Sequence, residues 1–176
     1  MQLPAETERL TFRELDAARD AAWAYRLNAD PQVIRYTGDV AFADEAAARR
    51  FLAAYDDYRR HGMGRWLVVR RADGEPLGWC GLKRRDSGEV DLGYRFLREH
   101  WGRGYATEAA RACLNLAFGS LGLTRVVAEI AEGNAASIRV AERLGMRLTA
   151  MRGRCGADPS RIYEALPAGA SDVHRP

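Results

Sequence analysis

Hydrophobic residues recur along this chain with two different periods. In residues 44–55, apolar side chains repeat at i, i+3 and i+4 behind Asp44, a suitable N-cap, which predicts an amphipathic helix. Asp16 is a candidate cap for an earlier helix that runs to about Asn28 and is stopped by the Asp-Pro pair at 30–31. Residues 10–14 fit a short edge strand before that helix.

From residue 66 onward the period changes to two. Apolar and polar positions alternate over residues 66–71, 77–83 and 89–96, which predicts three strands. The connections between them, at 72–75 and 85–88, are too short for the crossover that a parallel pair needs. We therefore expect an antiparallel meander.

A glycine-rich loop at residues 100–106 follows the meander and leads into a helix. Thr107 is the expected N-cap of this helix, and Gly122 its expected C-terminal stop. The same loop contains His100, which the polar surroundings place on the loop surface.

The last third of the chain predicts a strand at 125–130, then a helix capped by Asn134 and closed by Gly145. Residues 147–166 fit a final hairpin with a long connection, and residues 167–176 a disordered tail. The connection of that hairpin is expected to hold Gly153, Gly156 and Pro159.

Size and composition limit the class of protein. The chain has 176 residues, 47% hydrophobic and 29% charged, which suits one globular domain over residues 1–166. No apolar run reaches the roughly 18 residues of a membrane span, and the acidic start is unlike a secretory signal. We expect a cytoplasmic protein that does not insert into membranes.

Charge and cysteine content change this picture little. There are 27 basic and 24 acidic residues, and the basic doublets are separated by acids rather than aligned in one stripe, so nucleic-acid binding is not favoured. Lys83 is the only lysine, a bias that a GC-rich coding sequence explains best. The three cysteines stand far apart, so we expect neither a metal site nor a disulfide framework.

The glycine-rich loop is the strongest chemical signal. Glycines between a strand end and a helix N-terminus let backbone N–H groups converge on an anion. A dinucleotide-binding turn is one alternative, but four residues separate the strand from Gly102, and Thr107 replaces the third glycine. A loop whose glycines only make a turn is the other alternative.

Two stretches of the sequence resemble a known family. Residues 91–109, DLGYRFLREHWGRGYATEA, are similar to the acetyl-CoA motif of the GNAT N-acetyltransferases, most of all their RimJ/RimL-like branch. Residues 134–146, NAASIRVAERLGM, are similar to that family's next motif. The resemblance, over about residues 8–166, implies an α+β fold of the GNAT type, with a mixed, mostly antiparallel central sheet of about seven strands flanked by about four helices.

The resemblance also implies acetyl-CoA as cosubstrate and no metal. The strand end at Phe96 and Leu97 would pair its backbone with the pantetheine arm, and Asn134 would hydrogen-bond that arm. Trp101 stands where many relatives have glutamine or arginine, which weakens that one contact. The residues that match the pyrophosphate loop are Trp101, Gly102, Arg103, Gly104, Tyr105, Ala106 and Thr107.

Direct transfer from a thioester requires a neutral amine and a proton for the departing thiolate. Asp91 is the first candidate for the base, because family members often carry a carboxylate there; pairing with Arg95 would make it a poorer one. A solvated strand face is the alternative, and Glu108 is expected to be structural, opposing the helix dipole.

A second group would have to supply the proton to the departing thiolate. The tyrosine that many relatives carry falls here on Ala141, whereas Ser137 matches the serine of the RimJ/RimL-like branch. That hydroxyl could relay a proton at the coenzyme sulfur, or simply cap the helix at position N3. The glutamate that some members use falls on Gly156, so their base cannot be carried over.

The acceptor is expected to enter beside Arg35 and Tyr36, opposite the late loop at 152–161. The arginines of these segments suit an amine that also carries a carboxylate, or a peptide. The family resemblance thus implies an N-acetyltransferase for a small-molecule or peptide amine, acting as a monomer or homodimer. A coenzyme-binding sensor that has lost its chemistry is the second hypothesis.

Overall fold

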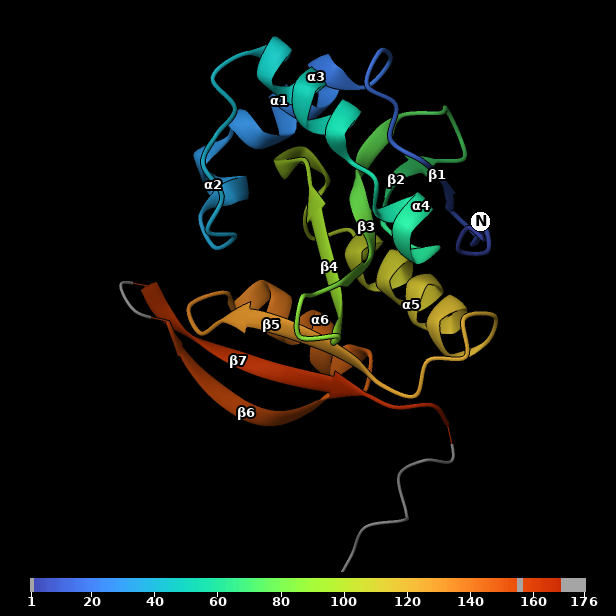
Figure 1. The fold of residues 1–176 in the computed structure, drawn as a ribbon, viewed down its shortest axis with the longest axis vertical. Coiled ribbons are helices and arrows are strands. Elements are labelled where there is room, and N and C mark those ends of the chain that lie inside the picture. Colours follow the sequence, from blue (N-terminus) through green and yellow to red (C-terminus); the bar gives the residue numbers. More distant parts are fainter. Residues whose placement is uncertain (1, 155–156, 169–176) are drawn as a thin grey trace, which may run out of the picture.

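The computed structural model describes residues 2–154 and 157–168, and its strands form one mixed seven-stranded sheet. The strand order is β1-β2-β3-β4-β5-β7-β6, with one parallel pair, β4 and β5, among the described strands (Figure 1). This confirms both the α+β class and the antiparallel meander. The strands are β1 (Leu10–Arg13), β2 (Arg65–Arg70), β3 (Pro76–Arg84), β4 (Val90–Phe96), β5 (Val126–Ala131), β6 (Arg147–Arg154) and β7 (Ala157–Ala165).

Six α-helices and one short 3-10 turn accompany the sheet in the described part of the chain. The four helices of nine or more residues, α1, α3, α5 and α6, are those that the hydrophobic periods predict, whereas α2 and α4 are too short to leave a period. The helical elements are α1 (Ala21–Ala29), α2 (Pro31–Ile34), α3 (Glu45–Ala54), α4 (Asp57–His61), η1 (Arg98–His100), α5 (Tyr105–Phe118) and α6 (Ala135–Arg143).

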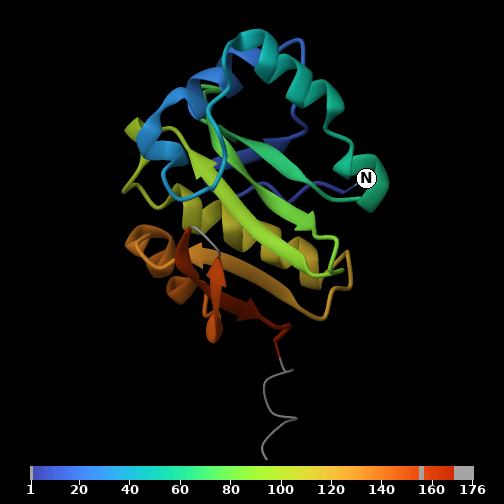
Figure 2. The same cartoon turned by 60° about the vertical axis from the view of Figure 1, so that its left-hand side comes forward.

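Two apolar clusters hold these elements together. Alternation along β4 sends Val90, Leu92 and Phe96 into the larger cluster, where they pack with the apolar side of α5. Trp79 and Leu97 instead pack with α1 and α3 in the smaller cluster. Figure 2 shows α5 behind the strands and α1 to α3 gathered at one end of the molecule.

Strands β4 and β5 separate soon after they meet. Both strands are described along their whole length, and they pair at one register position, Asp91 opposite Val127. In Figure 1 they then diverge, so that the C-terminal half of β4 has no partner strand on the β5 side. Backbone groups of β4 beyond Asp91 are thereby left for a partner other than a strand.

Several predicted boundaries are wrong. Helix α1 begins at Ala21 after Asp20, because the Asp16 carboxylate instead accepts hydrogen bonds from the backbone of Ala18 and Arg19 in a preceding turn. Helix α5 begins two residues before Thr107, at Tyr105, and ends before Gly119 rather than at Gly122.

The final hairpin also differs from the expectation. Gly153 lies within β6 and Pro159 within β7, so the strands run further than predicted and the connection between them is short. Gly156, expected in that connection, lies outside the described residues. The predicted tail at 167–176 likewise lies outside them from residue 169 onward.

Candidate functional site

The loop that opens α5 is built around two glycines with positive φ. Gly102 has φ +76° and Gly104 has φ +81°, a region that side chains with a Cβ rarely adopt. A Cβ on Gly102 would meet no atom within 4 Å, so the space beside the loop is open. Glycine is therefore required for the backbone conformation, and it also leaves room for a ligand.

The N-terminus of α5 differs from those of α3 and α6. Asp44 accepts a hydrogen bond from the Ala47 N–H at 2.6 Å at the start of α3, and Asn134 does the same for α6. Helix α5 has Gly104 at its N-cap position and no side-chain cap. Its first N–H groups are thus left to an external anion, which the helix dipole also favours.

Tyr105 and His100 flank this loop with buried side chains. The Tyr105 ring lies in the larger apolar cluster, so only its backbone faces the loop. The prediction that His100 lies on the surface is wrong, because its side chain is 5% exposed, with the ring packed edge-on against Tyr105. Its Nε2 lies 3.4 Å from Oε1 of Glu75, which ties the loop to the β2–β3 turn.

The end of β4 is linked to the loop by Trp101. The indole Nε1–H donates to the carbonyl of Phe96 at 2.8 Å, while the Trp101 ring remains 47% exposed. The next residue, Leu97, donates its N–H to the Leu77 carbonyl at 2.9 Å. Trp101 thus fixes the strand end, a role that the sequence comparison with glutamine and arginine did not suggest.

The first turn of α6 faces β4. The Asn134 side-chain oxygen accepts the N–H of Ser137 at 3.1 Å, which leaves the amide Nδ2 of Asn134 available as a donor. The side chain of Ser137 has a hydrogen bond with the Tyr94 hydroxyl, and the capping role expected as the alternative falls to Asn134. Tyr94 of β4 donates its hydroxyl to the Ser137 carbonyl at 3.4 Å, and burial raises the pKa of that hydroxyl above its ordinary range.

The other face of β4 carries a chain of ion pairs. Asp91 accepts from Arg65 at 2.6 Å through Oδ2 and from Arg85 at 2.7 Å through Oδ1. Arg85 also donates to Glu129 of β5 at 2.6 Å, and Glu129 in turn accepts the Ser160 hydroxyl at 2.7 Å. The three partners named here come from β2, from the turn after β3 and from β7, so the charges of Asp91 and Glu129 are largely satisfied within the protein.

Gly93 makes room for this arrangement. A Cβ at Gly93 would lie 2.5 Å from a guanidinium nitrogen of Arg65, which no real contact allows. The Arg65 guanidinium therefore lies flat across β4 and also donates to the Asp91 carbonyl at 3.1 Å. No local pattern indicated Arg65 or Arg85, because the contacts of Arg65 with Asp91 and of Arg85 with Glu129 join residues 26 and 44 positions apart.

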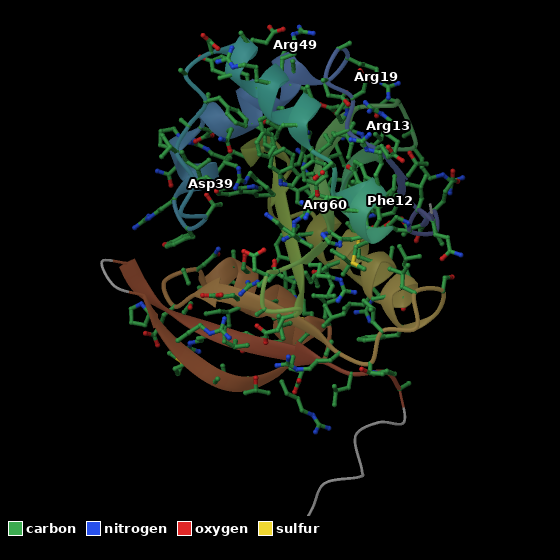
Figure 3. All side chains as sticks on the ribbon, in the orientation of Figure 1. Phe12, Arg13, Arg19, Asp39, Arg49 and Arg60 are labelled. Carbon is green, nitrogen blue, oxygen red and sulfur yellow. The ribbon has the colours of Figure 1, made fainter. Side chains whose placement is uncertain are left out.

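Arg95 does not pair with Asp91. It binds Asp39 and Asn28 and lies with its guanidinium carbon 5.2 Å from the centre of the Trp79 ring. Burial lowers the pKa of Arg95 below its ordinary value, an effect that the Asp39 ion pair opposes. Asp39 follows α2, and Figure 3 shows it beside the upper part of β4, so Arg95 anchors the segment after α2 to the sheet.

Tyr36, one of the two residues expected beside the acceptor, lies near the β5–α6 connection. An added Cβ on Gly133 would lie 3.2 Å from the Tyr36 ring, which brings the end of α2 to the β5–α6 connection. The Arg35 guanidinium carbon lies 5.1 Å from the centre of the same ring. Arg161, expected in a late loop, lies within β7 and pairs with Glu132 at 3.1 Å.

Comparisons with known proteins agree with this geometry. The family model described as "Acetyltransferase (GNAT) domain" matches residues 9–147. The chain is 31% identical over 144 residues to the uncharacterized N-acetyltransferase p20 of Bacillus licheniformis, covering 80% of each chain. A GNAT-family acetyltransferase from Bacillus anthracis has a similar structure, with a TM-score of 0.79, 25% identity and coverage of 92% of this chain and 96% of that one.

One further structure shares the fold at lower identity. The ribosomal-protein-S5-alanine acetyltransferase of Vibrio fischeri superposes with a TM-score of 0.78 at 16% identity, covering 99% of this chain and 100% of that one. The split sheet with an uncapped, glycine-opened helix therefore defines an acetyltransferase fold. The chain belongs to the GNAT acetyltransferase family. None of the helices in residues 2–154 and 157–168 is long and apolar enough to cross a membrane.

Proposed function

We propose that this protein is an acetyl-CoA-dependent N-acetyltransferase that moves an acetyl group directly to a primary amine. The observation that carries the proposal is the start of α5, where two positive-φ glycines open a helix that has no side-chain cap. Such a helix N-terminus suits a pyrophosphate group. Because the chain belongs to the GNAT family, acetyl-CoA is the ligand that we propose for it.

The residues that would hold acetyl-CoA fall in two groups. The backbone of residues 102–107 would bind the pyrophosphate. The end of β4 at Phe96 and Leu97 would pair with the pantetheine arm through the backbone groups that remain, since the Phe96 carbonyl and the Leu97 N–H already bond to Trp101 and Leu77. The free Nδ2 of Asn134 is a suitable donor for the same arm. Bound acetyl-CoA supplies a thioester carbonyl, which a neutral amine attacks with loss of the CoA thiolate.

Ser137 is the proposed group at the leaving sulfur. Asn134 and Tyr94 fix its backbone, and its side chain has a hydrogen bond with the Tyr94 hydroxyl, so the residue is held in one place at the start of α6. A serine hydroxyl is too weak an acid to protonate the thiolate fully. It would solvate the thiolate and relay a proton from water.

Asp91 is the weaker of the two catalytic candidates. Two guanidinium groups donate to its carboxylate, one to each oxygen. Because both oxygens already have partners, we assign Asp91 mainly to holding Arg65 and Arg85. The amine would then reach the site already neutral or lose its proton to water.

The acceptor is proposed to be a small-molecule or peptide amine, bound between the segment around Arg35 and Tyr36 and the β6–β7 hairpin. Both segments carry arginines, which suits an amine that also bears a carboxylate. A cytoplasmic location and a monomer or homodimer complete the proposal.

Calorimetric titration with acetyl-CoA tests the coenzyme part of the proposal. Saturable binding is expected, and its absence at millimolar ligand would refute it. Thiol release over a panel of amines, amino acids and N-terminal peptides then tests the chemistry. Binding without turnover on any amine would favour a coenzyme sensor, which Ala141 in place of the usual tyrosine also fits.

A further inference from the structure

The segment before β1 is fastened to the first turn of α5 by Glu108. The Glu108 carboxylate accepts the Thr7 hydroxyl at 2.5 Å and the Arg9 backbone N–H at 3.1 Å through Oε1. Its Oε2 accepts Nε of Arg9 at 2.7 Å, with Nη2 at 2.5 Å. A single acidic side chain thus binds both the backbone and the guanidinium of a segment nearly a hundred positions earlier.

The same guanidinium reaches the glycine loop. Nη1 of Arg9 donates to the carbonyl of Arg103 at 3.0 Å, and its guanidinium carbon lies 4.6 Å from the centre of the Tyr105 ring. A Cβ added to Gly104 would lie 3.5 Å from Nη2 of Arg9. Arg9 therefore contacts the residues on both sides of Gly104, the two that set the direction of the loop's N–H groups.

Arg9 has an electrostatic consequence as well. Glu108 lies in the first turn of α5, so its negative charge stands close to the N–H groups that would bind the pyrophosphate. An uncompensated carboxylate there would repel a phosphate. The paired Arg9 guanidinium cancels that charge and orders the loop at the same time.

We infer that Arg9 is a positioning residue for the pyrophosphate loop, which it holds through the Arg103 carbonyl while neutralising Glu108. This inference rests on the proposed function, since it assumes that the loop binds the pyrophosphate of acetyl-CoA. It predicts that Arg9 acts on ligands that carry the pyrophosphate and has no effect on those that lack it.

Arg71 offers a matched control. Its Nη1 donates to the carbonyls of Thr7 at 2.9 Å and Glu8 at 3.4 Å, so it anchors the same segment without touching the glycine loop. Arg71→Ala removes a comparable number of hydrogen bonds from that segment. Any effect shared by Arg9→Ala and Arg71→Ala comes from loosening the segment and not from the loop.

The first experiment measures CoA affinity by calorimetry for the wild type, Arg9→Ala, Arg9→Lys and Arg71→Ala, with thermal unfolding to verify folding. Loss of charge-assisted contacts predicts a Kd about tenfold higher for Arg9→Ala and near-wild-type affinity for Arg71→Ala. Arg9→Lys keeps the charge but not the fork that joins Glu108 to Arg103, so it should fall between the two. It also keeps the inference testable if Arg9→Ala does not fold.

The second experiment separates the loop from the rest of the site. With S-acetylpantetheine, which lacks the pyrophosphate, kcat/KM should be the same for Arg9→Ala and the wild type, whereas with acetyl-CoA it should fall through KM. Adding Glu108→Gln to Arg9→Ala should recover part of the CoA affinity, because the uncompensated charge is gone.

The outcomes are distinct. Equal losses for Arg9→Ala and Arg71→Ala, or equal losses with acetyl-CoA and S-acetylpantetheine, would overturn the role of Arg9 while leaving the proposed function intact. A wild-type protein that binds no CoA would overturn the proposed function itself, and the inference with it.

Discussion

The start of α5 and the face of β4 that carries Asp91 differ in how many of their polar groups already have partners. At α5 the polar groups are backbone N–H groups without a side-chain cap. On β4 the polar groups are side chains, and Asp91 and Glu129 are bound by arginines and a serine. At the start of α5 a ligand would meet free N–H groups, whereas on β4 it would have to compete with existing ion pairs or use other groups.

The first site would use backbone groups for recognition, and the second would use side chains. Backbone recognition needs glycine at fixed positions, and any anion with the right geometry can use it. Recognition by side chains depends on which charges remain unmatched after folding. Family membership therefore implies the proposed coenzyme, while the acceptor has to be found by screening.

The largest change in CoA affinity is expected from Gly104→Glu, which places a side chain beside the free N–H groups of the loop. A side chain at φ +81° is strained, and a carboxylate would face the phosphates, so Kd for CoA should rise by about a hundredfold or more. Gly88→Glu is the control, because Gly88 also has a positive φ of +86° and open space for a side chain but lies in the β3–β4 turn. Calorimetric affinity within a few-fold of wild type for Gly104→Glu would mean that the loop is not the binding site.

Asp91→Asn tests the ion-paired face of β4. The change removes the charge that holds Arg65 and Arg85, so the free energy of unfolding should fall by about 1.5–3 kcal/mol in a denaturant titration. Because Asp91 is assigned to positioning, kcat should fall less than tenfold and its pH profile should keep its shape.

The control for Asp91→Asn is Asp73→Asn, which breaks an exposed pair with Arg70 and should change stability much less. A fall in kcat of a hundredfold or more with a flattened pH profile would restore Asp91 as the general base, as the sequence alone suggested.

The start of α5 and the ion pairs on β4 also differ in how well the sequence predicts them. Gly102 and Gly104 are adjacent in sequence to the helix that they open, so a local pattern contains the whole anion site. The alternation of β4 likewise predicts that Asp91 and Arg95 share a face away from the core. Local periodicity is enough wherever the partners are close along the chain.

Long-range pairs are different. Arg9 meets Glu108 across 99 positions, and Arg65 meets Asp91 across 26, so no local pattern links them. His100 was misplaced for the same reason, since its burial depends on Glu75 and Tyr105, which only the folded chain brings to it. Contacts that tertiary packing creates are thus what the sequence could not predict.

Ser137→Ala tests the contribution of one hydroxyl group close to the proposed leaving sulfur. Loss of one hydrogen bond to the leaving sulfur should lower kcat about tenfold with little change in KM for acetyl-CoA. Ser87→Ala, in the exposed β3–β4 turn, is the matched control and should be silent. An unchanged kcat for Ser137→Ala would leave only the backbone of α6 with a role in the site.

The smallest effect, on the unfolding midpoint in acid, is expected from Glu108→Gln. Glu108 forms an ion pair with Arg9 at the start of α5. Burial raises the pKa of Glu108, but hydrogen bonds from Thr7 and Arg9 outweigh burial and hold the pKa below its ordinary value. A carboxyl group with a lowered folded-state pKa stabilises the fold above its unfolded pKa of about 4.3, and the contribution is lost as the pH falls further.

The wild-type unfolding midpoint should therefore fall more steeply below about pH 4.3 than that of Glu108→Gln, which cannot lose a charge there. Glu142→Gln, on the exposed side of α6, should follow the wild-type curve. Identical acid slopes for the wild type and Glu108→Gln would mean that the Thr7–Arg9–Glu108 contacts add little stability in solution. The order of the loop would then come from its glycines and the buried Tyr105 ring alone, and the two sides of the site would differ even more sharply.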